Sequence, residues 1–281
     1  MEREIDLHTH SIMSDGAQTP AEVVRTAHAA GLQAIALTDH DNLEGVPEAI
    51  AEGRRLGVEV IPGVELSAQS DTELHILGYF IDIHNKPLND AMTYALQVRQ
   101  QRQAETCRRL NEQGFAITMD EVRQQANGNN VLCRAHFAQI MVRKGYAPSV
   151  QQAFRDYLSV GCYAYCNRQA LSDREAIGLI RDAGGIPVAA HLHLIKMEDA
   201  PLKEYLRTLK SYGLQGVEGY YTDYTPDMAL RYRAMARELG LTLSGGSDYH
   251  GANKPHIAIG RGRGDLRIPY SVLEDLRRLL G

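Results

Sequence analysis

The sequence predicts an α/β fold, a distorted barrel of strand–helix units interrupted by a small helical domain. Short apolar runs alternate with helical patterns at both ends of the chain, and this alternation is typical of parallel sheets and barrels. Between about residues 89 and 158 the patterns are helical, without a convincing strand. We therefore assign 1–88 and 159–281 to one barrel and 89–158 to a helical insertion that caps it.

The first third of the chain contains four expected strands and two expected helices. The first helix has a clear start, because Thr19-Pro20-Ala21-Glu22 is a capping box with proline at the first helical position. We expect this helix to end near Gly31. The remaining elements are strands at 4–7, 34–37, 58–61 and 74–81 and a helix at 43–56.

Strand–helix alternation returns after the insertion. Ser172-Asp173-Arg174-Glu175 is a second capping box and predicts a helix start. Pro226 after Thr225 predicts another. We expect strands at 186–190, 216–220, 241–244 and 256–259, a helix ending near 212, and a last helix from about 270.

The charge of the chain is unevenly distributed. Its net charge is −5, which argues against nonspecific binding to nucleic acid. Segment 86–155 has ten Lys or Arg against five Asp or Glu, so it is +5 while the rest of the chain is −10. The charged N-terminus does not resemble a signal peptide, no apolar run is long enough for a bilayer, and four cysteines suit a reducing compartment. We expect a cytoplasmic protein without membrane attachment or an obligate protein partner.

Histidine and carboxylate side chains recur where the expected strands end. His8 and His10 are two residues apart on a strand, so both imidazoles point to the same side. In a parallel barrel such strand ends meet at one rim, where active sites lie. A single histidine is more often structural than a ligand, but the joint pattern indicates a metal centre. The candidate ligands are His8, His10, Asp15, His40, Glu65, His75, His191, Asp248 and His250.

The ligand set indicates more than one metal ion. Nine ligands with three carboxylates carry about −3 when the histidines are neutral, whereas three divalent ions bring +6. The surplus positive charge can hold a hydroxide and a phosphate. Imidazole and carboxylate ligands suit Mn²⁺, Zn²⁺ or Fe²⁺. We expect three divalent ions, with Mn²⁺ the preferred metal and Zn²⁺ or Fe²⁺ as alternatives.

These residues resemble the motifs of the polymerase-and-histidinol-phosphatase (PHP) superfamily. The likeness lies in His8-Thr9-His10 with Asp15, Thr38-Asp39-His40, His191 after an apolar strand, and Ser247-Asp248-Tyr249-His250. The resemblance implies a distorted (β/α)7 barrel that hydrolyses phosphoesters with three metal ions, and it implies all nine ligands. One departure lies in the third motif, which reads Ala190-His191-Leu192-His193 instead of Ala-His-Pro and leaves an additional histidine, His193, close to the expected metals.

The insertion resembles that of small stand-alone PHP phosphatases acting on nucleoside 3′,5′-bisphosphates, some of which are also 5′→3′ exonucleases on short RNA. Arg99 and Arg102 share a helix face, and guanidinium groups bind phosphate bidentately. The pattern alone favours a solvated helix face; with the resemblance, Arg99, Arg102, Arg134 and His136 become candidate substrate contacts. The substrate expected is a small nucleotide, or short RNA.

The expected reaction is removal of the 3′-phosphate from a nucleoside 3′,5′-bisphosphate through a hydroxide that bridges two metal ions. The candidate catalytic residues are His193, Asp15 and His40, with His193 or a water protonating the leaving oxygen. A short-RNA 5′→3′ exonuclease, which the same protein can combine with the phosphatase, and a small-metabolite phosphatase such as a histidinol phosphatase are the alternatives. A noncatalytic metal-binding module would be expected to have lost ligands.

Overall fold

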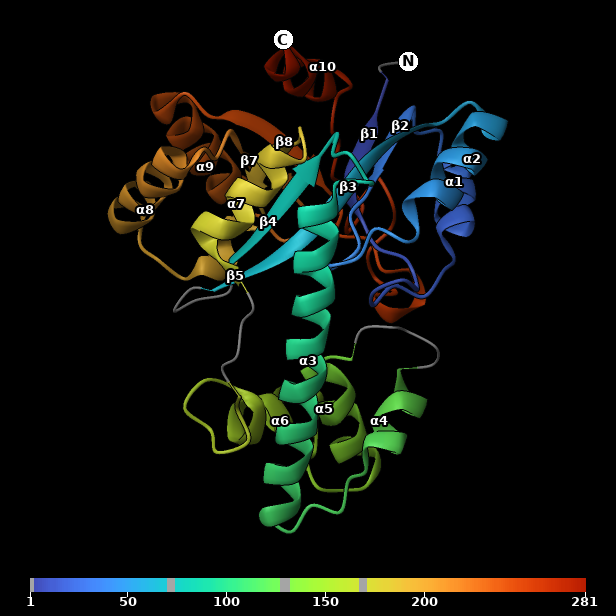
Figure 1. Cartoon of the computed structure of the whole chain (residues 1–281), viewed down its shortest axis with the longest axis vertical. Helices are drawn as coiled ribbons and strands as arrows, with labels where there is room; N and C mark the ends of the chain where they lie inside the picture. Colours follow the sequence, from blue (N-terminus) through green and yellow to red (C-terminus); the bar gives the residue numbers. More distant parts are fainter. Residues whose placement is uncertain (1–2, 70–73, 127–131, 167–170) are drawn as a thin grey trace.

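The computed structural model describes residues 3–69, 74–126, 132–166 and 171–281. A barrel-shaped sheet lies at one end of the molecule, and a helical segment projects from it (Figure 1). Seven strands follow one another in the sheet: β1 (Ile5–Thr9), β2 (Ala34–Leu37), β3 (Glu59–Gln69), β4 (Leu74–Tyr79), β6 (Ile186–Ala189), β7 (Gly216–Tyr221) and β8 (Thr242–Gly246). A two-residue strand, β5 (Leu171–Ser172), pairs with β3.

The sheet curls until its two edges approach each other. Tyr249, just after β8, forms a bridge with Thr9 at the end of β1. Strand β4 is antiparallel to both β3 and β6, and the other main pairs are parallel. The antiparallel strand distorts a barrel that would otherwise be parallel, and the predicted fold class is confirmed.

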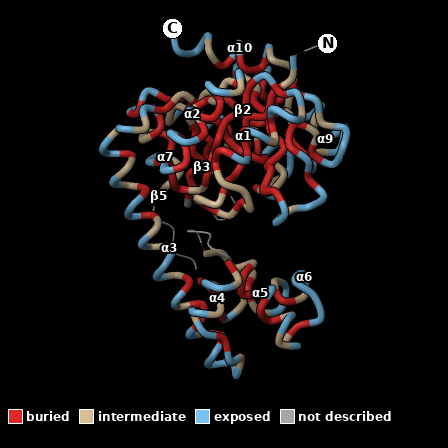
Figure 2. Tube along the Cα trace, turned by 90° about the vertical axis from the view of Figure 1, so that its right-hand side faces the viewer, coloured by how far each residue is buried: buried red, intermediate tan, exposed pale blue. Residues whose placement is uncertain are grey.

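Amphipathic helices cover the outside of the sheet, and their buried sides form its outer core (Figure 2). These helices are α1 (Pro20–Ala29), α2 (Val46–Leu56), α7 (Asp173–Asp182), α8 (Asp199–Tyr212) and α9 (Pro226–Leu239). Three of the predicted starts are confirmed, because Thr19, Ser172 and Thr225 cap α1, α7 and α9. Within the described residues, no helix has the length and apolar character to cross a membrane.

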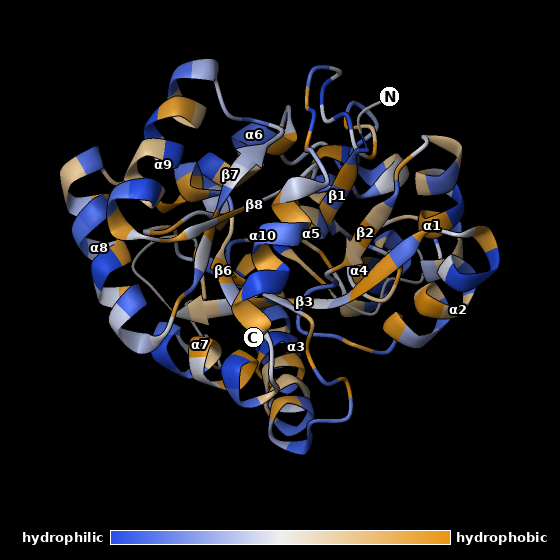
Figure 3. Ribbon diagram, turned by 90° about the horizontal axis from the view of Figure 1, so that it is seen from above, coloured by the Kyte–Doolittle hydropathy of each residue, from blue (hydrophilic) through white to orange (hydrophobic). Residues whose placement is uncertain are grey.

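The last helix, α10 (Ser271–Arg277), lies across one end of the barrel, as the view from above shows (Figure 3). Its Val272, Leu273 and Leu276 belong to the same buried apolar cluster as Ile5 and Leu7 of β1. Apolar side chains therefore fill much of the barrel interior at this end, and the histidine and carboxylate cluster lies toward the opposite end.

The helical segment lies at that opposite end. It begins with α3 (Lys86–Glu112), which is about 40 Å long at 1.5 Å per residue. Leu88 and Met92 of α3 pack into the barrel core, while Leu110 belongs to a separate core around Phe137. The segment continues with α4 (Met119–Gln125), α5 (Arg134–Arg143), α6 (Val150–Ala153) and the π-helical turn η1 (Phe154–Leu158). The exact domain boundaries stay a prediction.

Three expectations at the level of single elements were wrong or lie outside the described residues. Strand β3 continues to Gln69 because it forms a hairpin with β4, so Glu65 lies within the strand and not after it. The expected strand at 256–259 is a turn with one isolated bridge between Ala258 and Gly262. Its apolar Ile257 and Ile259 are buried, but Gly260 and Gly262 adopt positive φ and turn the chain. The segment Asn127-Gly128-Asn129-Asn130, whose sequence predicts a turn inside the insertion, lies outside the described residues.

Candidate metal centre

All nine candidate ligands lie at the end of the barrel that faces the insertion, and each of the three carboxylates is surrounded by histidines. Glu65 of β3 is the centre of the largest group and is 1% exposed. Its two oxygens lie 2.8–3.3 Å from ring nitrogens of five histidines, namely His8, His10, His40, His75 and His191. One buried carboxylate thus links side chains from five segments of the chain.

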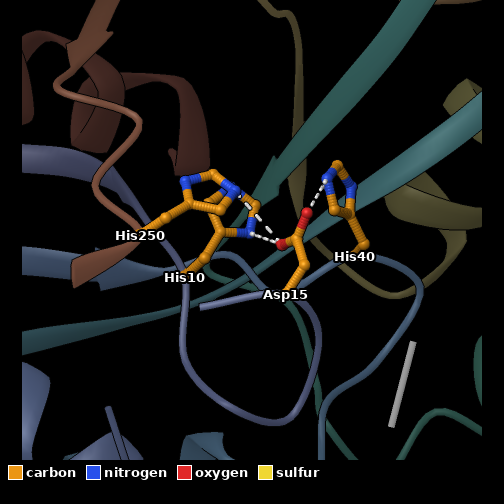
Figure 4. Close-up of side chains that lie close together, drawn as sticks. All are labelled: His10, Asp15, His40 and His250. Carbon is orange, nitrogen blue, oxygen red and sulfur yellow. Dashed lines mark ion pairs between the residues drawn. The ribbon is translucent and has the colours of Figure 1, made fainter. Parts of the chain in front are cut away.

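Asp15 and Asp248 form the other two centres. Asp15 lies in the loop after β1, and its oxygens are 3.1 Å from His250, 3.7 Å from His10 and 3.8 Å from His40 (Figure 4). Oδ1 of Asp248 lies 3.4 Å from both His10 and His250 and 3.6 Å from His8. Seven of the nine candidates form three overlapping groups whose ligand atoms lie within 4.8 Å of one another and could share a metal ion: His10–Asp15–His40–His250, His8–His10–Glu65 and His40–Glu65–His75. Asp248 and His191 are in none of these groups and join the cluster through their contacts with His10 and Glu65.

Burial and mutual attraction shift the pKa values of these groups strongly. Burial opposes ionisation of Glu65, but the charges of His40, His75 and His8 outweigh it and hold its pKa well below the usual range. Burial likewise opposes charge on His10, but Asp248 and Glu65 raise its pKa to about 9. Burial dominates at His40, whose pKa falls to about 3 despite Glu65 and Asp15. The carboxylates therefore remain ionised and attract positive charge into the cluster.

The donor set fits divalent cations. His8 Nδ1 lies 2.9 Å from the acceptor Glu218, so Nδ1 carries a proton, and Nε2 faces Glu65. Burial opposes charge on His8, but Glu218 and Glu65 raise its pKa well above the usual range, so the position between Nε2 and Glu65 favours a positive charge, which a metal ion can supply in place of a proton. In addition, Nε2 of His10 and Nδ1 of His40 are buried without a hydrogen-bond partner among the described residues. Six imidazoles and three carboxylates are ligands that transition-metal ions accept.

The backbone is bent at three residues beside the cluster. Asp41, His191 and Asp248 have φ values of 49°, 27° and 56°, a region that non-glycine residues adopt rarely. Such conformations persist where the surrounding structure enforces them, and they gather at functional sites. Here they turn the chain sharply after β2, β6 and β8, which directs the neighbouring side chains inward.

Three further carboxylates, which the sequence did not single out, hold the ligand-bearing segments. Glu218 of β7 accepts hydrogen bonds from His8 Nδ1 and from the backbone N–H of His191. Asp6 of β1 accepts from Ser247 and Gly260, and Asp39 accepts from Ser11 and Ser14. All three are buried. The available signal was an acidic residue inside a short apolar strand, as in Gly216-Val217-Glu218.

Asp248 receives two more contacts that sequence reasoning missed. Its Oδ2 accepts hydrogen bonds from the Tyr221 hydroxyl at 2.8 Å and from the Lys254 ammonium at 2.7 Å. Oδ1 remains directed at the histidines. The two contacts therefore fix which oxygen of Asp248 faces the cluster, and Lys254 adds positive charge beside it.

His193 lies in the 3₁₀ turn η2 (Leu192–Ile195), beside the cluster but outside the three groups of metal-ligand geometry. Its ring centroid is 5.4 Å from that of Tyr221 and 5.5 Å from that of Tyr224. Nδ1 of His193 is buried and has no hydrogen-bond partner in the described part of the chain. Its catalytic role stays a prediction.

The three arginines expected to bind phosphate differ in their hydrogen-bond partners. Arg99 reaches back from α3 to the barrel, where it donates to Asp41 at 2.6 Å and to Ser67 at 2.9 Å. Arg134 donates to the carbonyl of Leu158. Nε of Arg102 is buried without an acceptor among the described residues. Burial, followed by the charges of Arg99 and Arg134, lowers the pKa of Arg102 to about 10.

One ring nitrogen of His136 is used in a structural hydrogen bond. Its Nδ1 accepts a hydrogen bond from the backbone N–H of Cys133 and thereby caps α5. Burial lowers its pKa, although Asp15 attracts a proton to it. The ring therefore lies within electrostatic reach of the metal centre, and only Nε2 is left for a substrate.

A barrel with histidine and carboxylate clusters at one end defines the class of metal-dependent hydrolases. The PHP domain model matches residues 6–218, and the chain belongs to this family. The predicted family is thereby confirmed, and the match spans most of the barrel as well as the insertion.

Several known proteins resemble this chain over most of their length. A 5′-3′ exoribonuclease from Haemophilus influenzae is 32% identical, over 89% of this chain and 91% of its own. A 3′,5′-nucleoside bisphosphate phosphatase from Chromobacterium violaceum is 33% identical, over 88% and 87%. The structure of an amidohydrolase from Chromobacterium violaceum, solved with bound sulfate and no metal, superimposes with a TM-score of 0.84 at 32% identity and covers 92% of this chain and 90% of its own. The predicted class of enzyme, a hydrolase of phosphoesters, is confirmed.

Proposed function

We propose that this protein removes the 3′-phosphate from nucleoside 3′,5′-bisphosphates, releasing a nucleoside 5′-monophosphate and phosphate. The observation that carries the proposal is a pair of features at the same end of the barrel that can each bind a phosphate. One is the cluster of nine candidate ligands, which would attract anions through the metal ions it holds, and the other is the group Arg99, Arg102 and Arg134 on the insertion. A substrate with two phosphates fits two such sites, whereas a monophosphate needs one.

We further propose that the nine residues hold three divalent ions, with Mn²⁺ as the preferred metal. Support comes from the three overlapping ligand groups and from the three carboxylates, one at the centre of each set of histidines. When bound, divalent ions polarise phosphoryl oxygens and lower the pKa of a bound water from ~15.7 toward ~7. His40 and Asp15 belong to the group at the open side of the cluster and are our candidates for residues that act on the attacking water.

Arg102 and Arg134 are the proposed holders of the 5′-phosphate. Charge-assisted contacts between guanidinium and phosphate are about twice as strong as neutral hydrogen bonds. Arg102 is best suited because its buried Nε lacks an acceptor among the described residues. Arg99 supports the site from behind, since its contact with Asp41 connects the insertion to the residue after His40. Nε2 of His136 is a further candidate contact.

His193 is the proposed proton donor for the leaving 3′-oxygen. It follows the candidate ligand His191 by two residues, and its ring packs on Tyr221, whose hydroxyl contacts Asp248. This position is beside the ligands without being one of them. A proton donor in that position would act on the oxygen that leaves the phosphorus.

A second candidate function is a 5′→3′ exoribonuclease on short RNA, which the exoribonuclease relative favours. It would use the same groups, because the same 3′-oxygen leaves in both reactions and the second nucleotide is only an additional ester on the phosphate that is attacked. A small-metabolite phosphatase such as histidinol phosphatase has less support, since it would have no use for a second phosphate-binding site on the insertion.

A phosphate-release assay with Mn²⁺ tests the proposal, using adenosine 3′,5′-bisphosphate, AMP, histidinol phosphate and a 5′-phosphorylated dinucleotide. We expect rapid phosphate release from the bisphosphate and little from AMP or histidinol phosphate. Cleavage of the dinucleotide to mononucleotides would identify the exonuclease activity. Faster hydrolysis of histidinol phosphate than of the bisphosphate would overturn the proposal.

A further inference from the structure

Glu218 is a charged side chain in the middle of strand β7 with no exposed surface. Burying a carboxylate costs several kcal/mol unless its oxygens find strong partners. Both oxygens do so, and both partners come from candidate ligands. Oε1 lies 2.9 Å from His8 Nδ1, and Oε2 accepts the backbone N–H of His191 at 2.5 Å. One carboxylate thus connects β1 with the end of β6, two strands that are not neighbours in the sheet.

The contact with His8 determines which ring nitrogen carries the proton. An ionised carboxylate only accepts hydrogen bonds, so Nδ1 of His8 must be the donor. In a neutral imidazole Nε2 is then left with a lone pair, and this nitrogen faces Glu65 at 3.3 Å and Asp248 at 3.6 Å. Nε2 is therefore available as a metal ligand only while Nδ1 keeps its proton.

The contact with His191 concerns the backbone. His191 has φ 27°, and its Nε2 lies 2.9 Å from Glu65. The hydrogen bond from its N–H to Glu218 holds this bent backbone in place, and the bent backbone aims the imidazole at Glu65. The Tyr224 hydroxyl donates to the Glu218 carbonyl and accepts from Leu192, which fixes the same region from the other side.

We propose that Glu218 is a positioning residue for the metal centre, which fixes the Nδ1–H tautomer of His8 and the backbone of His191 together. The inference rests on the proposed metal centre, to which it adds a residue beyond the nine ligands. Partners of this kind typically change metal affinity by about 10- to 100-fold when they are removed. Glu218 serves two ligands at once, so we expect the upper part of that range.

Glu218→Gln is the most specific substitution, because it keeps the shape of the side chain and replaces one carboxylate oxygen with an amide NH₂ group. The backbone N–H of His191 can only donate, so the amide oxygen must turn toward it. The amide NH₂ then faces His8, whose Nδ1 must lose its proton to accept the hydrogen bond. The proton moves to Nε2, and His8 can no longer bind a metal ion through that nitrogen.

The first test measures Mn²⁺ binding by equilibrium dialysis for the wild type, Glu218→Gln and the control Ser244→Ala. Ser244 lies on the neighbouring strand β8 and donates a buried hydrogen bond to Tyr79 of β4; within the described residues it makes no hydrogen bond to a candidate ligand. We expect Glu218→Gln to weaken the affinity for at least one ion by about 100-fold and Ser244→Ala to leave all affinities unchanged. Equal affinities in the wild type and Glu218→Gln would overturn the inference.

The second test needs no variant at position 218, so it remains informative if Glu218→Gln does not fold. Long-range ¹⁵N NMR of histidine-labelled, Zn²⁺-loaded protein reports the tautomer of each ring, and the His8 signals are identified by their loss in His8→Gln. We expect a proton on Nδ1 of His8. A proton on Nε2 instead would overturn the inference. If the wild type binds no divalent ion at all, the proposed function fails, whereas a proton detected on Nδ1 of His8 in the metal-free protein still tests the hydrogen bond to Glu218.

Discussion

Arg102 should lower the free energy of unfolding of the ligand-free protein, because its positive charge is largely buried and lies near the charges of Arg99 and Arg134. We predict that Arg102→Met, which keeps the length and apolar stem, raises the thermal stability of the protein in the absence of phosphate. The folded-state pKa of Arg102 is lowered from 12.5 to about 10 by burial and by Arg99 and Arg134. The charged form is therefore less favourable in the folded than in the unfolded protein. This cost is present in full at every pH below about 10, including neutral pH.

The magnitude follows from the same shift. A change from 12.5 to about 10 corresponds to roughly 3 kcal/mol, and partial exposure of the side chain reduces it to about 1–2 kcal/mol. A protein of this size gains about 2–4 °C per kcal/mol, so we expect the Tm to rise by roughly 2–8 °C. Above about pH 10 the folded wild type loses the proton first, and the difference between the two proteins should shrink.

Thermal denaturation in phosphate-free buffer, followed by a phosphate titration, checks this prediction. Phosphate should stabilise the wild type more than Arg102→Met, because it supplies the counter-charge that Arg102 lacks. Arg108→Met is the matched control, since Arg108 lies on the same helix but is exposed and paired with Glu105. A Tm of Arg102→Met equal to or below that of the wild type without phosphate would show that Arg102 is structural, and the phosphate-site reasoning would be wrong.

Further substitutions test the proposed roles of the candidate residues. His40→Ala or Asp248→Ala should lower kcat by on the order of 10³-fold while circular dichroism shows an intact fold; full activity in either contradicts the metal centre. Arg102→Ala should raise KM for the bisphosphate by about 10- to 100-fold and barely change it for an aryl phosphate, whereas Arg99→Ala should raise it less, because Arg99 is already paired with Asp41. An equal rise in KM with Asp41→Asn, which removes only the ion pair, would mean that Arg99 acts by holding the insertion. His193→Ala should lower kcat by about 10²- to 10⁴-fold at unchanged metal content, and loss of metal would make it a ligand instead.

The sequence predicted the barrel well where local signals were strong. Capping residues such as Thr19 and Ser172 satisfy backbone groups within one helix turn, so their effect is readable from neighbouring residues. The strand predicted at 256–259 was wrong, because whether a segment pairs as a strand depends on residues distant in sequence. Its alternating apolar residues are buried as a strand's would be, but Gly260 and Gly262 bend the backbone away from a neighbouring strand. Alternating apolar residues predict which side chains are buried, whereas the hydrogen bonding of a strand depends on partner strands elsewhere in the chain.

The candidate ligands were predictable because strand ends of a barrel converge whatever the details of the loops. Their supports were not, since Glu218 and Asp6 act through residues more than two hundred positions away in sequence. The partner of Arg99 was equally unpredictable, because the sequence pattern assigned the same expected role in phosphate binding to Arg99 and Arg102. Only the three-dimensional structure reveals that Arg99 has a carboxylate partner in the barrel.

This difference between Arg99 and Arg102 bears on how the substrate is recognised. A guanidinium already paired with Asp41 would have to exchange a good partner for a phosphate, so it would contribute little net affinity. A buried guanidinium without an acceptor loses nothing when the phosphate arrives. Discrimination between one and two phosphates should therefore depend more on Arg102 than on Arg99. The paired Arg99 instead fixes the insertion to the residue beside His40, which sets the distance between the second phosphate site and the metal centre.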